Sequence, residues 1–388
     1  MKTTFKINYN NFIDKLFLIY ICFFYAFPYQ ILKVELILLS LILLFLRRIK
    51  LNIFLLWSIL YVIILLFSIL YSINPGSSLT KALQVLKSLL FANLLISSIN
   101  YREEIERIFK YFIFSGFVLI GRILSVFPIS EIGKSRIHIP GLFNSNDIGL
   151  KLSISLLCVL YFLVLKRKKN ILFYFELIML YSFSIFTGSR TAFLFASLEI
   201  VILLLVTIKN RIKLLLVLFI IIMSIYLFGN QIINLPIVYN TLGKRLNSFM
   251  YIFSKEGRID ESSIIRINMI RDGITYFLKK PFLGYGVDNY RYLSHYQTYS
   301  HNNYIELLVG LGIFGTIVYY FSYIFILFKS FIEFFKGRKE IVIFIILIFL
   351  LLIVDFGTVS YYERYNIFIL AFSFLGIETK NYLKEYSK

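Results

Sequence analysis

Long apolar runs alternate with short polar segments along almost the whole chain. A bilayer core about 30 Å thick requires about 20 mostly apolar residues per helix. On this criterion, with somewhat shorter spans tolerated, the pattern predicts about twelve membrane-spanning helices. The predicted spans are residues 14–28, 31–46, 51–72, 81–98, 109–128, 147–165, 171–187, 191–208, 212–228, 303–329, 340–357 and 364–378. The expected fold class is an all-α integral membrane protein, with residues 1–388 forming a single polytopic membrane domain.

One connection is much longer than the others. Residues 229–302 separate the ninth and tenth predicted spans, and long loops inside compact domains are usually functional. Apolar residues recur within this loop at helical spacing, ahead of a Pro- and Gly-containing stretch that ends the periodicity. These residues are Ile264, Ile267, Ile270, Ile274 and Phe277. The pattern predicts an amphipathic helix that lies against the membrane or over a cavity.

Composition and charge narrow the class of protein further. Hydrophobic residues make up 59% of the chain and charged residues 16%, with a mean hydropathy of +0.80, which excludes a soluble enzyme and a disordered chain. Lys and Arg number 41 against 21 Asp and Glu, and the basic residues gather in short segments such as 47–50, 166–169 and 336–339. Basic clusters between long apolar runs are typical of a multi-pass membrane protein and not of a nucleic-acid-binding protein. The positive-inside rule places both termini in the cytoplasm and the 229–302 loop outside the cytoplasmic (inner or plasma) membrane.

Several familiar motifs carry no weight here. The run Gly310-Leu-Gly312-Ile-Phe-Gly315 matches a dinucleotide-binding fingerprint, but it follows no strand and lies inside an apolar span, so it indicates helix packing. There is no ATPase phosphate-binding loop, no His-Glu-x-x-His and no Gly-x-Ser-x-Gly, which disfavours a pump or a serine hydrolase. The two cysteines, Cys22 and Cys158, lie in apolar runs and form no disulfide or zinc pattern.

Two side chains on the outer face are the main candidates for chemistry. His301 lies at the outer mouth of the tenth span, where a neutral imidazole could take a proton from a substrate hydroxyl. The alternative is a surface histidine at a membrane interface. Arg190 is the lone cation in a short outer turn between the seventh and eighth spans. It could hold phosphate oxygens through its planar fork, or it could extend to lipid headgroups.

Further charged residues leave alternatives open. Arg266 lies on the predicted loop helix, and Arg271 competes with it one turn further on. Arg136 and His138 precede a polar turn that contains Asn146, and a solvated loop is the favoured explanation of both. Charges inside predicted spans keep a transporter possible; they are Lys33, Glu35, Lys87, Arg122, Glu176, Glu199 and Asp355. No outer segment shows an Asp-x-Asp pair, so we expect no metal site and no cofactor, and arginines must neutralise any bound diphosphate.

Three segments taken together resemble a known family. They are Thr187-Gly-Ser-Arg-Thr-Ala192, then Arg266 followed by Lys280-Pro-Phe-Leu-Gly-Tyr-Gly-Val-Asp-Asn-Tyr290, then Ser300-His-Asn-Asn-Tyr-Ile-Glu306. Gly141-Leu-Phe-Asn-Ser-Asn146 adds a turn before a central span. Their order and spacing over roughly residues 130–320 resemble the bacterial O-antigen ligase and Wzy-type polysaccharide polymerase superfamily.

The resemblance implies a metal-independent glycosyltransferase that acts on polyprenyl-diphosphate-linked glycans. In such enzymes the arginines that match Arg190 and Arg266 hold the diphosphate, and the histidine that matches His301 activates the acceptor hydroxyl. We therefore expect these three residues to be catalytic. The residues expected to bind substrate are Arg136, Asn146, Arg271, Asn302 and Tyr304.

The expected function is polymerisation of lipid-linked oligosaccharide repeat units for a surface polysaccharide such as capsule, O-antigen or exopolysaccharide. The transfer would invert the sugar and occur at the outer membrane face. A ligase that moves a glycan onto a lipid core or a protein is the alternative within the class, and the lack of an added C-terminal soluble domain favours the polymerase. A flippase or secondary transporter is the alternative from another class. Expected partners are the lipid-linked donor and acceptor, membrane lipids and, as a candidate, a chain-length regulator.

Overall fold

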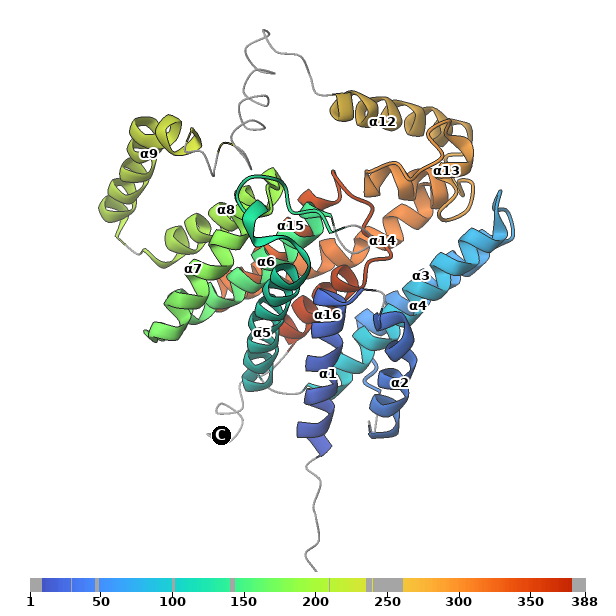
Figure 1. The fold of residues 1–388 in the computed structure, drawn as a ribbon. Helices are drawn as coiled ribbons and strands as arrows, with labels where there is room; N and C mark the ends of the chain where they lie inside the picture. The colour runs from blue at the N-terminus through green and yellow to red at the C-terminus, as the bar shows by residue number, and fades with distance from the viewer. Residues whose placement is uncertain are drawn as a thin grey trace, which may run out of the picture. The chain divides into compact units, whose positions relative to one another are not determined.

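The computed structural model describes residues 9–28, 30–45, 49–99, 102–139, 144–208, 210–234, 239 and 261–378. Within these ranges the protein is helical and contains no strand, which confirms the predicted all-α class (Figure 1). The longer helices before the 229–302 loop are α1 (Tyr9–Ala26), α2 (Gln30–Phe45), α3 (Ile53–Ile69), α4 (Pro75–Ser98), α5 (Arg102–Val126), α6 (Ser145–Leu160), α7 (Ile171–Phe186), α8 (Arg190–Thr207) and α9 (Arg211–Ile233). Within or after the loop come α12 (Glu261–Lys279), α13 (Tyr290–Leu293), α14 (Asn303–Phe335), α15 (Val342–Val354) and α16 (Arg364–Glu378).

Every predicted span falls on one of these helices. Among the residues that the structure describes, six helices are long and apolar enough to cross a membrane. They are Pro75–Ser98, Glu104–Val126, Ser145–Leu165, Arg190–Thr207, Ile212–Gly229 and Asn303–Phe335. A multi-pass membrane protein follows from these helices. The total of about twelve spans and the orientation of the termini stay predictions.

The chain divides into two compact units. The first comprises Met1–Phe17, Val34–Ile105 and Asp260–Lys388, and the second comprises Leu18–Lys33 and Glu106–Ile259. The single membrane domain over residues 1–388 stays a prediction.

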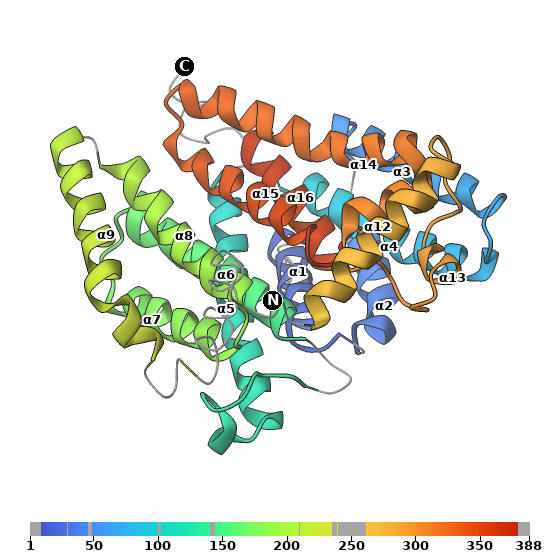
Figure 2. The same ribbon diagram turned by 90° about the horizontal axis from the view of Figure 1, so that it is seen from above.

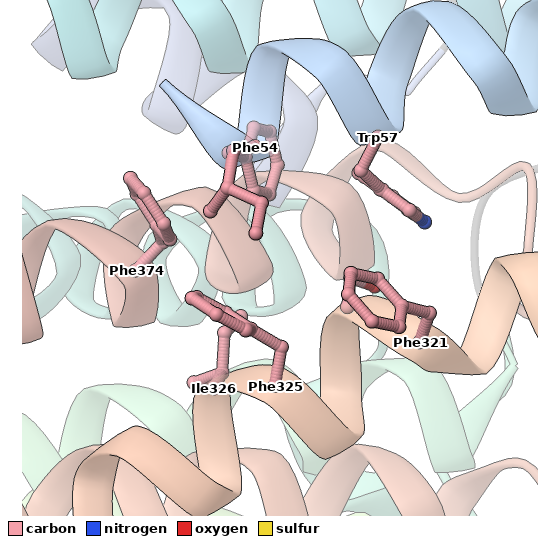
Figure 3. Close-up of a pocket in the computed structure, with 8 residues that line it drawn as sticks. Phe54, Trp57, Phe321, Phe325, Ile326 and Phe374 are labelled. Atoms are coloured by element: carbon pink, nitrogen blue, oxygen red, sulfur yellow. The ribbon is translucent and has the colours of Figure 1, made fainter.

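In the first unit, α3, α4, α14, α15 and α16 pack against one another (Figure 2). Aromatic side chains make up much of this packing: Trp57 stacks on Tyr61 with ring centroids 5.8 Å apart, and Tyr61 contacts Tyr319 at 5.4 Å. The indole N–H of Trp57 donates to the carbonyl of Val318 at 2.7 Å, so its polar atom is satisfied inside an apolar contact. A small pocket remains between α3, α14 and α16, where Phe54 faces Phe321, Phe325 and Phe374 (Figure 3). Its lining carries no ionisable group and therefore no acid–base chemistry.

A buried ion cluster ties three helices of this unit together. Glu35 of α2 is fully buried and accepts two hydrogen bonds from Arg364 of α16, at 2.8 and 3.0 Å. Lys87 of α4 lies 3.3 Å from the same carboxylate. Removing one member of such a cluster would leave an uncompensated buried charge, which costs about 3–5 kcal/mol. These two intramembrane charges, Glu35 and Lys87, therefore have a structural role that needs no transported ion.

In the second unit α6 is the central helix and packs against α7 and α8. The approach of α6 to α8 depends on Gly149, because a Cβ at this position would lie 2.2 Å from the Cβ of Ala192. On the neighbouring side, a Cβ at Gly116 of α5 would lie 2.7 Å from the hydroxyl of Ser155 on α6. Such close packing through small residues is typical of membrane helices. It brings the polar turn before α6 next to the turn before α8.

Candidate functional site

The loop that carries His301 is held rigidly at the start of α14. The backbone N–H of Ser300 donates to Oε2 of Glu306 at 2.8 Å, and the Ser300 hydroxyl donates to the carbonyl of Asn302 at 2.8 Å. Asn302 caps α14, since its side chain accepts from the N–H of Ile305. His301 itself has a left-handed backbone with a φ of 54°. That conformation costs a non-glycine residue about 1–3 kcal/mol and is typical of functional sites.

The imidazole of His301 is half-buried. Its ring lies against Tyr299, with centroids 4.4 Å apart. Burial lowers the pKa of His301 below its usual value, and the positive charge of Arg266 lowers it further. A histidine in this state has a free nitrogen lone pair and can accept a proton from a hydroxyl. The structure thus brings two of the three expected catalytic residues, His301 and Arg266, into one electrostatic neighbourhood.

The packing of α12 on α14 accounts for the position of Arg266. The contact is an apolar cluster of Met269, Tyr285, Tyr290, Ile305 and Val309. The Tyr290 hydroxyl donates to the carbonyl of Met269 at 2.7 Å, so the cluster also holds the helix backbone. At Gly273 a Cβ would lie 2.2 Å from Cγ2 of Ile305, and only glycine allows this approach. Arg266 lies one turn before Met269 along α12 and is exposed.

The glycine run of α14 forms a notch that receives residues 281–287. Gly312 is non-helical, with φ 63° and ψ −168°, and a Cβ there would lie 2.2 Å from the carbonyl of Phe282. The N–H of Gly286 donates to the carbonyl of Gly310 at 2.8 Å. Close packing was the expected use of these glycines, but their partner is this loop segment and not another helix. The notch fixes where α12 ends relative to α14.

A polar cluster attaches the loop between α15 and α16 to the first turn of α14. The Oδ1 of Asn303 accepts from the N–H groups of Ser360 and Tyr361, both at 3.0 Å. Its Nδ2 donates to the carboxylate of Asp355 at 3.2 Å, and the Tyr320 hydroxyl donates to the same carboxylate at 2.8 Å. The hydroxyl of Ser360 also donates to Asp355. Asp355, an intramembrane charge in the sequence, therefore holds Asn303, which lies two residues after His301. We call Asn303, Tyr320, Asp355 and Ser360 the His301 scaffold.

The structure also shows structural roles for Asp288 and Asn289 that the sequence patterns did not indicate. Asp288 is buried, has a left-handed φ of 62°, and accepts from Arg291 at 2.8 Å and from the hydroxyl of Ser77. The neighbouring Asn289 donates to the hydroxyl of Ser78 at 2.7 Å, so the segment is attached to the start of α4. The Asp-Asn pair after Gly286 stood within the motif and could have indicated a fixed turn.

The sequence analysis also did not select Lys81 and Tyr362, which contact each other in the structure. Lys81 of α4 places its ammonium 3.3 Å from the ring centroid of Tyr362, and Gln84 donates to the Tyr362 carbonyl at 3.1 Å. No local sequence signal links α4 to the loop before α16, so neither Lys81 nor Tyr362 could have been selected from spacing.

Glu306 of α14 is buried, and its Oε1 has no hydrogen-bond partner among the residues the structure describes.

The second unit gathers the remaining cationic candidates. Arg136 donates from Nη2 to Oδ1 of Asn146 at 2.9 Å, and the hydroxyl of Ser189 donates to the same oxygen at 2.9 Å. Ser189 also caps α8, whose first residue is the half-buried Arg190. One amide therefore links the turn before α6 to the turn that carries Arg190. Arg136 and Asn146 are thus hydrogen-bonded, and Arg190 directly follows Ser189, which shares the Asn146 oxygen.

Other expected residues have structural partners or lie apart. The hydroxyl of Tyr304 donates to the carbonyl of Leu352 at 2.9 Å, and its ring stacks on Tyr320. Asn302 serves as the α14 cap, and Arg271 is exposed. Their roles in substrate binding stay predictions. His295 is exposed, lies against Tyr296 and has no place in the His301 scaffold.

No three His, Cys, Asp or Glu side chains come together as a metal-ion site in the described ranges. The basic side chain whose charge acts on His301 is Arg266, whereas Arg291 is paired with Asp288. The arrangement can bind a negatively charged leaving group and accept a proton from a hydroxyl.

Comparison with known proteins identifies a family that part of the chain is similar to. Residues 175–320 match the family model described as O-Antigen ligase. The matched segment contains Arg190, Arg266 and His301, and it confirms the resemblance to the O-antigen ligase and Wzy-type superfamily. No curated protein matches the chain. The match supports glycan transfer of the O-antigen ligase or polymerase type, by a membrane enzyme that acts on lipid-linked glycans.

Proposed function

We propose that this O-antigen-ligase-type membrane protein is a repeat-unit polymerase of a surface polysaccharide. Its donor would be a growing glycan on a polyprenyl diphosphate, and its acceptor would be a hydroxyl of an incoming lipid-linked repeat unit. The reaction would take place at the outer face of the cytoplasmic membrane. The product would be a surface polysaccharide such as a capsule, an O-antigen or an exopolysaccharide.

In the proposed reaction His301 removes the proton of the acceptor hydroxyl. The oxygen then forms a bond to the anomeric carbon of the donor sugar, while the bond from that carbon to the diphosphate oxygen breaks. The diphosphate leaves with the electron pair, and attack from the opposite face inverts the sugar. Arg266, whose charge acts on His301, would stabilise the negative charge that develops on the leaving group. That Arg190 also holds the diphosphate is implied by the family resemblance alone. No metal ion is required for these steps.

The observation that carries the proposal is the state of His301. The imidazole is half-buried, lies against Tyr299 and has its pKa lowered by burial and by Arg266. A general base must be unprotonated at working pH, and a cation beside it suits an anionic leaving group. A histidine placed only to interact with lipid headgroups would gain nothing from a lowered pKa, since its protonated form would bind them better.

The polymerase is tested with purified protein and a single species of lipid-linked repeat unit in detergent. We expect a ladder of products that each differ by one repeat unit. Detergent leaves no compartments, so a flippase or secondary transporter would yield no product. Substrate movement in sealed vesicles, without any elongation by folded protein in detergent, would contradict the proposal.

A ligase is the second candidate, because the matching family model is described as O-Antigen ligase. The same bond chemistry then transfers the finished glycan to a lipid core or a protein. Supplying the lipid-linked repeat unit alone separates the two functions. A polymerase elongates it, whereas a ligase forms product only after a lipid-core or protein acceptor is added.

A further inference from the structure

The helix α12 carries two apolar faces, and only one of them is packed. The face that includes Met269 and Gly273 contacts α14. A second row of apolar residues follows the spacing of three and four that lines one side of a helix. It consists of Ile264, Ile267, Ile274 and Leu278, and we call it the exposed stripe. Leu278 is 69% exposed and the three isoleucines 44–45%, although an apolar row of this length is normally covered in a folded protein.

The exposed stripe continues into the surface of a membrane-spanning helix. Directly after α12, Phe282 is 62% exposed and stacks on Phe314 of α14, with ring centroids 5.8 Å apart. Phe314 is itself 57% exposed, and Ile317, on the same side of α14, is 59% exposed. α14 is long and apolar enough to cross a membrane, so exposed apolar residues along its length face lipid. In both ribbon views α12 lies beside α14 (Figures 1 and 2).

We propose that α12 lies in the membrane surface, with its exposed stripe embedded among lipid chains and Arg271 bound to lipid phosphate. An amphipathic helix of this kind buries its apolar side at the boundary of headgroups and acyl chains. Arg271 falls within the stripe, four residues after Ile267 and three before Ile274. Its long side chain can extend from that position to the headgroups. This binding needs no glycan and is independent of the proposed glycosyl transfer.

The placement assigns different roles to the two arginines of α12. Arg266 precedes Met269 and Gly273 by three and seven residues, so it lies on the side that faces α14 and lowers the pKa of His301. Arg271 lies on the other side, among the apolar residues of the stripe. Of the two candidates that the sequence left open, Arg266 therefore serves the chemistry and Arg271 anchors the helix to lipid. A consequence is that a diphosphate carried by a membrane lipid meets Arg266 at the depth where its headgroup already lies.

The proposal is tested by spin labels in lipid vesicles. Both native cysteines, Cys22 and Cys158, are first replaced by alanine, and single cysteines are then introduced at Ile274, Leu278 or Lys279. Lys279 is the matched control, because it is also exposed but is turned by about 100° from Leu278 around the helix. Collision rates are measured with oxygen, which concentrates in lipid, and with a water-soluble nickel complex. Vesicles contain phosphatidylethanolamine and phosphatidylglycerol.

Labels at positions 274 and 278 should collide several-fold more with oxygen than with nickel, and the label at 279 should show the reverse ratio. In vesicles with phosphatidylglycerol, replacing Arg271 with Gln should reduce the difference in collision ratio between positions 274 and 278 and position 279. Arg271→Lys should leave this difference unchanged because a headgroup requires only charge. Equal access of nickel to positions 274, 278 and 279 would overturn the proposal. Exclusion of both colliders from 274 and 278 would also overturn it, since a second copy of the chain would then cover the stripe. None of these outcomes depends on glycan transfer, so the proposed function can fail separately.

Discussion

Replacing Gly273 with alanine should separate α12 from the His301 loop. A Cβ at this position would lie 2.2 Å from Cγ2 of Ile305, whereas ordinary contacts between such atoms begin near 3.4 Å. Ile305 is only 7% exposed and is β-branched, so its methyl group cannot rotate away within a helix. The clash must therefore move α12 outward by about 1 Å.

The size of the effect follows from this displacement. Overpacking a core contact typically costs about 1–3 kcal/mol, and the better helix propensity of alanine returns up to about 1 kcal/mol. Stability should thus fall by at most about 3 kcal/mol, and by at most about 2 kcal/mol if alanine contributes the full 1 kcal/mol, so the protein should still insert and fold. Activity should fall by roughly 100-fold, because a 1 Å misplacement of a catalytic group has about that consequence. A variant that still folds but has lost most of its activity is the result expected if Arg266 has been displaced.

The assay measures elongation of lipid-linked repeat units together with thermal unfolding in detergent. Gly121→Ala is the control, because a Cβ added to this glycine of α5 would meet no atom within 4 Å, and the activity of this variant should not change. Adding Ile305→Ala to Gly273→Ala removes the clashing methyl group and should recover most of the lost activity. If Gly273→Ala alone retains full activity, or if the double variant shows no recovery, then α12 packing does not position the catalytic arginine.

Three further outcomes are expected. Arg190→Lys keeps the charge but loses the planar fork, so elongation should drop about 10- to 150-fold; unchanged activity would assign Arg190 to lipid headgroups. Activity should survive EDTA, because the predicted outer segments carry no Asp-x-Asp pair that would hold a metal–diphosphate complex; loss that Mg²⁺ restores would refute this. The rate should fall as pH drops through a His301 pKa that lies below the usual 6.5. Arg266→Gln removes a charge that lowers this pKa, so the acidic limb of the pH–rate profile should move to higher pH, and an unmoved limb would deny the coupling.

Local sequence patterns predicted the helices well. Each predicted span coincides with a helix, and the loop helix forms as α12 over Glu261–Lys279. Apolar runs of this length have one favourable structure in lipid, since every backbone N–H and C=O must be satisfied within the helix. Arg190 and His301 could be selected because lone polar groups at the ends of apolar spans are few.

The faces of α12 and the residues contributed by distant elements could not be predicted. The isoleucine periodicity suggested one apolar face, but Ile270 and Phe277 pack on the cluster with α14 whereas Ile267 and Ile274 are exposed. Gly273 was the available signal, because a glycine inside an otherwise good helix indicates close approach of another element.

Lys81 and Tyr362 come from α4 and from the loop before α16, and they meet only in the folded protein. Asp355 appeared in the sequence as a costly membrane charge. Its partners Asn303, Tyr320 and Ser360 explain it without any transport function. Contacts between such distant segments depend on tertiary packing, which periodicity does not encode.

Whether His301 is the general base of glycan elongation can be measured by comparing purified wild type with two histidine variants. Purified wild type, His301→Ala and His295→Ala are each incubated with the same lipid-linked repeat unit in detergent, and the products are separated by length. General-base assistance is typically worth about 10²–10⁴-fold. We expect a full ladder from wild type and from His295→Ala, whose exposed ring lies outside the scaffold, and single repeat units from a folded His301→Ala. A ladder of wild-type rate and length from His301→Ala would contradict the account.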